Sequence, residues 1–343
     1  MEWNEKIIAR AAEAGARYAF TSMHIPEENG LAYGSEAREM LSLLSSLDID
    51  LIVDVGPETP AKLGCSSIYD LRGMGITCLR LDYGFSDAEI AELSSSFRIV
   101  LNASIVQGRQ LEAWVSMGVD ASRFIACHNF YPKPFTGLDL ADVARTDEQL
   151  KSVGLNAMGF VPGDGELRGP LYEGLPTVEQ HRERRSDVAF NMLELAYGGG
   201  CDVVLVGDID LSESGWEQFS AVSAGYVDLH CALHQGYEYL ANQVFYDRLD
   251  SSALVFRSSE MRTTSDRDVK VSPDAYAGAP RPVGSISLSN DRYGRYEGEL
   301  EIARRDLPSD VRQNVVGQVC KADLELLPFI RSGFGARLLS VAS

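Results

Sequence analysis

The sequence lacks long apolar runs and is poor in basic side chains. No stretch approaches the ~18 uncharged apolar residues that a membrane-spanning helix needs, and the first residues, MEWNEKIIAR, lack the apolar core of a signal peptide. The 31 Lys and Arg residues against 50 Asp and Glu residues give a net charge of −19 at pH 7. Because such a charge repels phosphate backbones, nucleic acid is a poor partner. We expect a cytoplasmic protein with a small-molecule ligand and neither a membrane nor a nucleic-acid partner.

The sequence also lacks the short motifs of several common chemistries. Its six cysteines form no C-x-x-C pair, and Cys78 and Cys127 lie inside apolar runs, which predicts reduced core thiols instead of disulfides or a zinc site. The absence of a G-x-S-x-G motif argues against a serine nucleophile. The first strand-like run ends in HIPEENG, without the glycine-rich loop that a nucleotide-binding, doubly wound sheet usually carries.

Eight apolar runs of strand length alternate with helix-like segments in the first two thirds of the chain. They are continuous instead of alternating with polar residues, which is typical of parallel strands buried on both faces. The runs cover residues 18–25, 50–55, 77–82, 98–104, 123–129, 156–162, 202–208 and 226–233. Eight such units predict an α/β fold, a (β/α)8 TIM barrel over residues 1–237. A doubly wound open sheet is the alternative.

A different pattern begins near residue 238. Short alternating runs separated by turn residues predict a small β-rich domain over residues 238–343, and a chain of 343 residues is long enough for two domains. Within this part, GSISLSNDRYGRYEGELEIA is typical of a hairpin whose turn lies near Asn290, Asp291 and Gly294.

Polar residues gather where the strands of the predicted barrel end, and barrel enzymes place their active sites at that face. Carboxylates, amides and imidazoles at nearly every strand end describe a hydrogen-bonding cavity, which suits a polyhydroxylated ligand better than an apolar one. In strand order the candidates are His24 and Glu27, Asp54, Asp82, Asn102, His128 and Asn129, Asp164 and Glu166, and Asp208.

The segment between the sixth and seventh strands, PGDGELRGPLYEGLPTVEQHR, is a long irregular loop at the predicted catalytic face. It carries Asp164, Glu166 and Glu173, so a general acid and a general base could both come from this loop, or from this loop together with Asp208. Paired carboxylates are the usual machinery of glycoside hydrolysis. In the structural alternative, Asp164 and Glu166 shape the turn and Asp208 caps the next helix.

A metal site at the barrel mouth is a competing prediction. The donor types that metal-dependent hydrolases use are present at strand ends, in His24, Asp54, Asp82, His128 and Asp208. However, no H-x-H follows the first strand, and the sixth and seventh strands supply no histidine. We therefore expect no metal and no other cofactor. His181, in the charged run QHRERR, is expected on a solvated helix face.

Several long strings of the sequence are specific enough to carry a family resemblance. They are FTSMHIPEE, LRLDYGF, LNAS, HNFYPKPFTGL, PGDGELRGPLYEGLPTVEQHR, GDIDLSE, RPVGSISLSNDRYGRYEGELEIARRDLPSD and NVVG. Through them the chain closely resembles the MupG-type 6-phospho-N-acetylmuramidases, a glycoside hydrolase family. The resemblance implies an N-terminal (β/α)8 barrel followed by a small cyclophilin-like β domain. It also implies hydrolysis of the β-1,4 bond of 6-phospho-N-acetylmuramyl-N-acetylglucosamine in the cytoplasm, during recycling of cell-wall sugars.

The resemblance carries over to individual positions. It implies substrate-binding roles for His24, Glu27, Asp82, Asn102, His128, Asn129, Arg168 and Tyr172. It implies that the catalytic groups are among Asp164, Glu166, Glu173 and Asp208. One departure lies after the seventh strand, where the chain has Gly207-Asp208-Ile209 in place of a Gly-Asp-Pro-like string. The aspartate is kept there, but the loop after it should differ in shape.

The phosphate of such a substrate needs hydrogen-bond donors, and an arginine fork matches its geometry better than a lysine does. Arg168 in the barrel loop is one candidate, and Arg257, Arg262 and Arg281 in the small domain are others. We expect Arg257 and Arg281 to bind the phosphate. The alternative is that these arginines pair with surface carboxylates.

The predicted reaction is hydrolysis through an oxocarbenium-like transition state, with Glu166 or Asp208 as general acid. The partner carboxylate could be the nucleophile, the base for water, or a support for attack by the substrate's own 2-acetamido group. The sequence leaves these three open, together with the oligomeric state. Two other functions stay as alternatives: a metal-dependent sugar-phosphate hydrolase or lyase, and a noncatalytic sugar-phosphate sensor.

Overall fold

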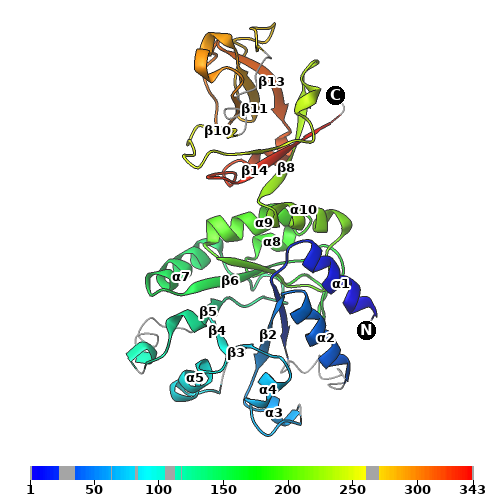
Figure 1. Ribbon diagram of the computed structural model, residues 1–343, viewed down its shortest axis with the longest axis vertical. Coiled ribbons are helices and arrows are strands. Elements are labelled where there is room, and N and C mark those ends of the chain that lie inside the picture. Colours follow the sequence, from blue (N-terminus) through cyan, green and yellow to red (C-terminus); the bar gives the residue numbers. More distant parts are fainter. Residues whose placement is uncertain are drawn as a thin grey trace. The chain divides into compact units, whose positions relative to one another are not determined.

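The computed structural model describes residues 2–22, 35–62, 64–81, 84–104, 113–116, 118–259 and 270–341. The chain divides into two compact units, Met1–Ser220 and Ala221–Ser343, called unit 1 and unit 2 below. Unit 1 contains a parallel sheet with helices, and unit 2 contains a second, mixed sheet (Figure 1).

The sheet of unit 1 has seven parallel strands that follow one another in sequence order. They are β1 (Tyr18–Ser22), β2 (Asp50–Val55), β3 (Cys78–Leu81), β4 (Arg98–Asn102), β5 (Phe124–Cys127), β6 (Asn156–Val161) and β7 (Val203–Val206). Strand β1 also contacts β7, so the sheet nearly closes into a barrel. The α/β class and the parallel sheet are therefore confirmed.

Both faces of this sheet are buried, as the continuous apolar runs predict. Ile52, Val100 and Ile125 belong to the cluster on one face. Val53 and Ile99 belong to the larger cluster on the other face, which also contains helix residues. Neighbouring residues of one strand therefore alternate between two apolar environments, as the pleat of a strand requires.

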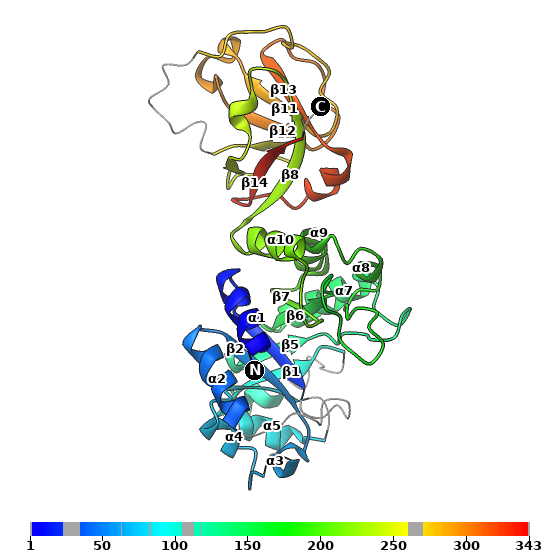
Figure 2. The same ribbon diagram turned by 90° about the vertical axis from the view of Figure 1, so that its right-hand side faces the viewer.

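Helices precede, connect and follow the strands of unit 1. They are α1 (Glu2–Glu13), α2 (Ser35–Ser46), α3 (Thr59–Lys62), α4 (Asp70–Gly73), α5 (Asp87–Ser94), η2 (Ala121–Arg123), α7 (Leu140–Ser152), α8 (Gln180–Glu183), α9 (Val188–Leu193), the π-helical η3 (Glu194–Gly199) and α10 (Glu213–Ser223). Ser86 begins α5 with a capping box to Glu89, which supplies partners for two backbone N–H groups. Helices α7 and α9 pack against β6, and Figure 2 shows these elements together.

The expected eighth barrel strand does not belong to the barrel. Strand β8 (Tyr226–Leu233) lies in unit 2, between β13 and β14. Its apolar side chains Val227, Leu229 and Cys231 are buried, whereas the intervening His230 is exposed. This alternation is typical of a strand with one buried face. The prediction of an eight-stranded barrel that ends with 226–233 is therefore wrong.

Unit 2 is built around a seven-stranded sheet in the order β10-β12-β11-β13-β8-β14-β9. Its other strands are β9 (Val244–Tyr246), β10 (Val255–Arg257), β11 (Ser285–Ser289), β12 (Leu300–Ala303), β13 (Gln313–Val319) and β14 (Gly335–Ser340). Short 3-10 helices η4 (Glu238–Leu240), η5 (Asp291–Tyr296) and η6 (Lys321–Leu326) join them. Strands β8 and β14 are parallel, and the other pairs are antiparallel. The cyclophilin-like label stays a prediction.

Several local predictions are confirmed. Strands β11 and β12 pair antiparallel, and η5 forms the turn between them, as the hairpin prediction requires. All six cysteines are free thiols. No helix in the described part of the chain is long and apolar enough to cross a membrane.

Candidate functional site

A layer of polar side chains lies inside unit 1 at the carboxyl ends of its strands. It consists of Ser22 on β1, Asp54 on β2, Arg80 on β3 and Asn129 just after β5, and is called the polar floor below. Nη1 of Arg80 lies 3.0 Å from Oδ1 of Asp54, and both side chains are only 6% exposed. Ser22 Oγ lies 3.5 Å from Asp54 Oδ2. The second guanidinium nitrogen of Arg80 donates to Oδ1 of Asn129. Buried charges of this kind need partners, and these residues supply them to one another.

Arg80 is a residue of this floor that the candidates taken from the sequence do not include. The signal was present, because Arg80 is a charge inside the apolar run TCLRLD. In a strand buried on both faces, such a charge requires an internal counter-charge. Asp54 in the neighbouring run DLIVDV is that counter-charge.

Aromatic side chains form the apolar neighbourhood of the floor. Phe20, Phe130 and Phe160 pack edge to face, with ring centroids 5.2 to 6.0 Å apart. The guanidinium carbon of Arg168 lies 5.6 Å from the centroid of Phe130, a cation–π distance. Burial lowers the pKa of Arg168, and the nearby Asp208 carboxylate opposes this shift. The structure therefore places one predicted substrate-binding residue, Arg168, over an aromatic ring at this edge of the sheet.

Asp208 anchors the loop that follows β6. Its Oδ2 accepts hydrogen bonds from the backbone N–H groups of Gly163, at 2.8 Å, and Leu175, at 3.0 Å. Its Oδ1 accepts one from the N–H of Arg168 at 3.0 Å. The side chain is buried. Three backbone donors therefore occupy this carboxylate, and they fix both ends and the middle of the loop.

The carboxylate of Asp164 is also occupied by hydrogen bonds within the protein. Its Oδ1 accepts a hydrogen bond from the N–H of Ser212 at 2.9 Å, and its Oδ2 accepts one from the Ser212 hydroxyl. The same hydroxyl accepts a hydrogen bond from the N–H of Gly215 in the first turn of α10. Asp164 therefore holds Ser212, the residue that caps α10. These contacts agree with the alternative in which Asp164 has a structural role in the turn.

Glu166 and Glu173 differ from these two aspartates. The backbone carbonyl of Glu166 accepts hydrogen bonds from Ile209 and Asp210, which ties the loop to the turn after β7. Its carboxylate, like that of Glu173, is on an exposed residue. Within the described part of the chain, no side chain or backbone group donates a hydrogen bond to either carboxylate. Of the four predicted catalytic residues, Glu166 and Glu173 are held in the loop through their backbone carbonyls, so their carboxylates remain available.

A hollow of about 550 Å³ lies beside Glu173, lined by Pro134, Phe135, Glu179, Arg182 and Arg185 among others. The segments that line it follow β5 and β6, so it lies at the same edge of the sheet as the polar floor. Arg182 is buried and bonds to Glu179 and to the carbonyls of Tyr131, Glu173 and Gly174. The hydrogen bond from Arg182 is the main reason that the pKa of Glu179 falls to about 2.

Two exposed aromatic residues at this edge adopt left-handed backbone conformations. Phe135 has φ of 68° and Tyr172 has φ of 57°. The Phe135 side chain is 90% exposed and that of Tyr172 is 65% exposed. The N–H of Phe135 donates to Glu179 at 2.9 Å, which helps to hold this conformation. Left-handed conformations are costly for bulky residues and gather at functional sites.

His128 does not face the polar floor. Its Nε2 lies 2.7 Å from Oδ1 of Asp147 on α7, and both side chains are 1% exposed. Cys201 donates to the other oxygen of Asp147 at 3.2 Å. Cys127, one residue earlier, lies in the opposite core cluster, so the pleat directs His128 toward the helices. This side chain is therefore part of the packing between β5 and α7.

His128, Asp147 and Cys201 are also the group of described residues whose atoms could surround a metal ion. Their contacts of 2.7 and 3.2 Å are those of hydrogen bonds. His181 is fully buried, with Nε2 at 3.0 Å from Glu194, so its expected position on a solvated helix face is wrong. In both places a carboxylate pairs with a buried histidine.

The remaining candidates are Asn102, which the structure describes, and four residues that it does not describe. Asn102 ends β4, is buried, and accepts a hydrogen bond from the N–H of Ser104 at 3.0 Å. The residues outside the described part of the chain are His24, Glu27, Asp82 and Arg262.

The two predicted phosphate ligands of unit 2 are both paired with carboxylates. Arg281 is 7% exposed and donates to Glu301 at 2.6 Å. Burial raises the pKa of Glu301, and the charge of Arg281 opposes this shift. Arg257 on β10 lies 3.3 Å from Asp250 and also donates to the Asp250 carbonyl. Binding of a phosphate to either arginine would require these contacts to open.

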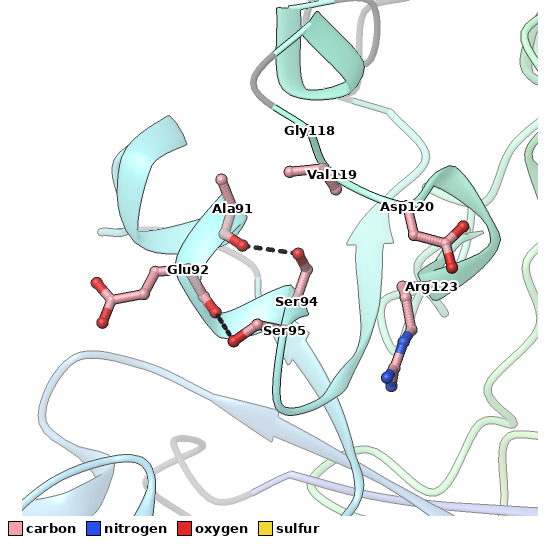
Figure 3. A pocket seen from close by; sticks show the side chains of 8 residues that line it. All are labelled: Ala91, Glu92, Ser94, Ser95, Gly118, Val119, Asp120 and Arg123. Atoms are coloured by element: carbon pink, nitrogen blue, oxygen red, sulfur yellow. Dashed lines mark hydrogen bonds between the residues drawn. The ribbon is translucent and has the colours of Figure 1, made fainter.

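A second hollow, of about 470 Å³, lies at the other edge of the parallel sheet (Figure 3). Its lining comes from the end of α5 and from residues 118–123, which precede β4 and β5. Ser94 and Ser95 donate to carbonyls of α5 inside it. The amino ends of barrel strands usually serve stability, so this hollow is not the candidate site.

Comparisons with known proteins give one consistent result. A family model described as "6-phospho-N-acetylmuramidase, N-terminal" matches residues 1–221. A second, described as "6-phospho-N-acetylmuramidase, C-terminal", matches residues 227–338. None of the curated proteins matches the chain significantly.

Two solved structures are similar over nearly the whole chain. One is a conserved protein of unknown function from Enterococcus faecalis, with 29% identity, a TM-score of 0.73, and coverage of 99% of this chain and 93% of that one. The other is an uncharacterized Bacillus cereus protein, with 25% identity, a TM-score of 0.70, and coverage of 98% and 95%.

Proposed function

The chain belongs to the 6-phospho-N-acetylmuramidase family of glycoside hydrolases, and we propose that it cleaves the β-1,4 bond of 6-phospho-N-acetylmuramyl-N-acetylglucosamine in the cytoplasm. The observation that supports this most is the arrangement of the loop after β6. Asp164 and Asp208 fasten the loop, and the carboxylates of Glu166 and Glu173 stay available on it. A phosphorylated sugar substrate and six free thiols both suit a reducing intracellular compartment.

Glu166 is proposed as the general acid that protonates the leaving oxygen. Its position is fixed through its backbone, which accepts from Ile209 and Asp210, so its side chain can serve the reaction. Glu173 is the proposed partner, because it lies on the same loop and lines the hollow at this edge. The partner can act as nucleophile, as base for water, or as a support for the substrate's 2-acetamido group. The separation of the two carboxylates in the bound state, ~5–5.5 Å or ~6.5–9.5 Å, decides between the first two.

Asp208 has a different proposed role from Glu166. A carboxylate that accepts three backbone hydrogen bonds stabilises the loop conformation as long as it stays ionised. Protonation during each turnover would break these contacts. We therefore place Asp208 as the positioning residue of the loop and no longer as an equal candidate for the general acid.

The anionic part of the substrate is assigned to Arg168. This guanidinium lies over Phe130 at the carboxyl edge of unit 1, on the loop that carries the proposed acid. A half-buried arginine beside an aromatic ring binds oxyanions more strongly than an exposed one, because less water competes for its donors. Tyr172 and Phe135 are proposed to pack on the faces of the sugar rings, as exposed aromatic side chains can do.

The proposal is tested by incubating the purified protein with the phosphorylated disaccharide and with its unphosphorylated counterpart. Mass spectrometry then follows release of 6-phospho-N-acetylmuramic acid and N-acetylglucosamine. Cleavage of the phosphorylated compound that is abolished in Glu166→Gln supports the proposal. Unchanged turnover in Glu166→Gln would remove Glu166 from the mechanism.

A further inference from the structure

The side-chain amide of Asn129 has a fixed orientation, because its contact with Arg80 determines whether the amide oxygen or the amide nitrogen faces the interior. An arginine side chain has only donors, so the amide group that it contacts must be the oxygen. The structure has this arrangement, with Arg80 Nη2 donating to Asn129 Oδ1. The two N–H donors of Asn129 therefore point away from Arg80.

Arg80 is itself held rigidly. Its other guanidinium nitrogen lies 3.0 Å from Asp54, and its side chain is 6% exposed. The backbone carbonyl of Asn129 accepts a hydrogen bond from the Thr177 hydroxyl at 2.9 Å, which fixes the residue from a second side. Thr177 is fully buried, and its hydroxyl also accepts from the N–H of Phe160 on β6. Both the backbone and the amide plane of Asn129 are therefore set before any ligand arrives.

The amide nitrogen of Asn129 has no acceptor among the residues that the structure describes. Asn129 is half-buried, at the carboxyl edge of the sheet where the polar floor meets the loops after β5 and β6. A fixed donor of this kind binds oxygens that can only accept hydrogen bonds. It does not select for a sugar hydroxyl, because a hydroxyl can rotate to donate or to accept.

We propose that Arg80 is a positioning residue that presents the Asn129 amide as a pure donor to an acceptor-only oxygen of the substrate. This inference rests on the proposed function, because it assigns a group of the same substrate to the same site. The oxygen belongs either to the acetamido carbonyl at C2 or to the 6-phosphate. Both present acceptors at neutral pH, and the ligands used below separate these two sources. The lactyl carboxylate at C3 is a third acceptor-only group. It is present in all three ligands, so an equal loss for all three would place the contact there and overturn this assignment.

The decisive variant is Asn129→Asp. The carboxylate has nearly the shape of the amide and keeps an oxygen toward Arg80, so the contact with Arg80 survives or strengthens. Toward the substrate it replaces two donors by an acceptor. The variant is expected to unfold at the same denaturant concentration as the wild type, or at a higher one. Asn156→Asp is the matched control, because Asn156 is an exposed asparagine at the opposite, amino end of β6.

Three ligands are compared by calorimetry with the full-length protein. They are 6-phospho-N-acetylmuramic acid, its unphosphorylated form, and the 6-phosphate with a hydroxyl in place of the acetamido group at C2. Asn129→Asp is expected to bind the first ligand at least tenfold more weakly, and to bind the ligand that lacks the recognised group less than threefold more weakly. The ligand that escapes the loss identifies the oxygen.

Arg80→Lys tests the positioning role separately. Lysine keeps a cation for Asp54 but cannot contact both Asp54 and Asn129 with a planar fork. It is expected to reduce the discrimination between the three ligands, with no further loss of discrimination in the double variant with Asn129→Asp. If Arg80 had a purely structural role, Arg80→Lys would weaken the binding of all three ligands equally.

Three results would overturn the inference. They are unchanged binding of all three ligands by Asn129→Asp, an equal loss for all three, and a failure of this variant to fold. The last would contradict the premise that a carboxylate replaces the amide in the Arg80 contact. Because binding is measured without turnover, a wild type that binds these ligands but does not cleave the disaccharide would count against the proposed function, while the affinity ratios would still decide the role of Asn129.

Discussion

Glu179 and Arg182 hold each other through hydrogen bonds of 2.7 and 3.1 Å. The other donors of Arg182 reach backbone carbonyls after β5 and β6, and the other acceptor positions of Glu179 take the N–H groups of Phe135 and Gly137. The pair therefore joins the two loops that surround the hollow beside Glu173. Its loss should loosen both loops at once.

Glu179→Gln is expected to lower the free energy of unfolding by about 1.5–3 kcal/mol, because it leaves the buried Arg182 without a counter-charge. Urea unfolding at pH 7 measures this loss. Glu183→Gln is the control, since Glu183 is an exposed glutamate of α8, the short helix that begins directly after Glu179. An equal effect of the two changes would contradict the role of the Glu179 and Arg182 pair.

The contribution of Glu179 should also depend on pH. Its folded-state pKa of about 2 is lower than its ordinary value of 4.5, so its stabilising effect is fully present above about pH 4.5. The effect is lost as the pH falls toward about 2, where the folded-state carboxylate takes up a proton. The stability difference between wild type and Glu179→Gln should be constant from pH 7 to 5.5 and smaller at pH 3.5. A constant difference down to pH 3.5 would contradict this assignment.

Asp208→Asn is expected to destabilise the loop after β6 without removing the proton donor of the reaction. An amide has one oxygen, so it cannot accept from Gly163, Leu175 and Arg168 as the carboxylate does. The free energy of unfolding should fall by about 1.5–3 kcal/mol, and residues 162–176 should be cleaved faster by added protease. Asp87→Asn, on an exposed residue of α5, serves as control.

The pH profile separates an anchor from an acid. If Asp208 acts through the loop, the residual activity of Asp208→Asn keeps both limbs of the wild-type profile. Loss of the alkaline limb would identify Asp208 as the group that must be protonated, and would contradict the anchor role.

Glu166→Gln is expected to lower kcat by about 10²–10⁴-fold, the usual contribution of a general acid or base. Stability should stay within about 0.5 kcal/mol of the wild type, because Glu166 is exposed. Restored turnover with a substrate whose leaving group needs no protonation, such as a nitrophenol, would assign the acid role. Glu148→Gln, an exposed glutamate on α7, controls for the loss of one surface charge. A fall in stability that parallels the fall in kcat would contradict the assignment.

Chelators should leave the activity unchanged. The buried contacts of Asp147 with His128 and Cys201 have hydrogen-bond lengths, and they lie on the helix side of β5. Treatment with EDTA followed by elemental analysis and an activity assay measures this. Activity that disappears with EDTA and returns with zinc would favour a metal-dependent hydrolase instead.

The strands of unit 1 were predictable because burial on both faces leaves a direct trace in the sequence. Seven of the eight runs are parallel strands of one sheet. The length and apolar content of the eighth run, YVDLHCAL, predict a barrel strand, although Asp228 and His230 alternate with Val227 and Leu229. That alternation follows from one buried face, and it marks the strand as part of the mixed sheet of unit 2.

The candidate site was predictable in part, because residue types show where polar groups gather but not which side they face. Asn129 and Arg168 lie at the carboxyl edge as expected, whereas His128 faces α7. The sequence shows that Cys127 and His128 point to opposite faces, yet it cannot tell which face is the inner one. The hydrogen bond from the N–H of Gly163 to the Asp208 carboxylate depends on the path of the loop after β6. No local pattern encodes that path.

The most direct test of the account is cleavage of the disaccharide by the EDTA-treated protein. The phosphorylated and unphosphorylated forms of N-acetylmuramyl-β-1,4-N-acetylglucosamine are compared at equal concentration, with products identified by mass spectrometry. We predict that only the phosphorylated form is cleaved, to 6-phospho-N-acetylmuramic acid and N-acetylglucosamine, and that Glu166→Gln loses this activity. Tight binding of the phosphorylated form without any cleavage would contradict the account and identify the protein as a sensor of the sugar phosphate.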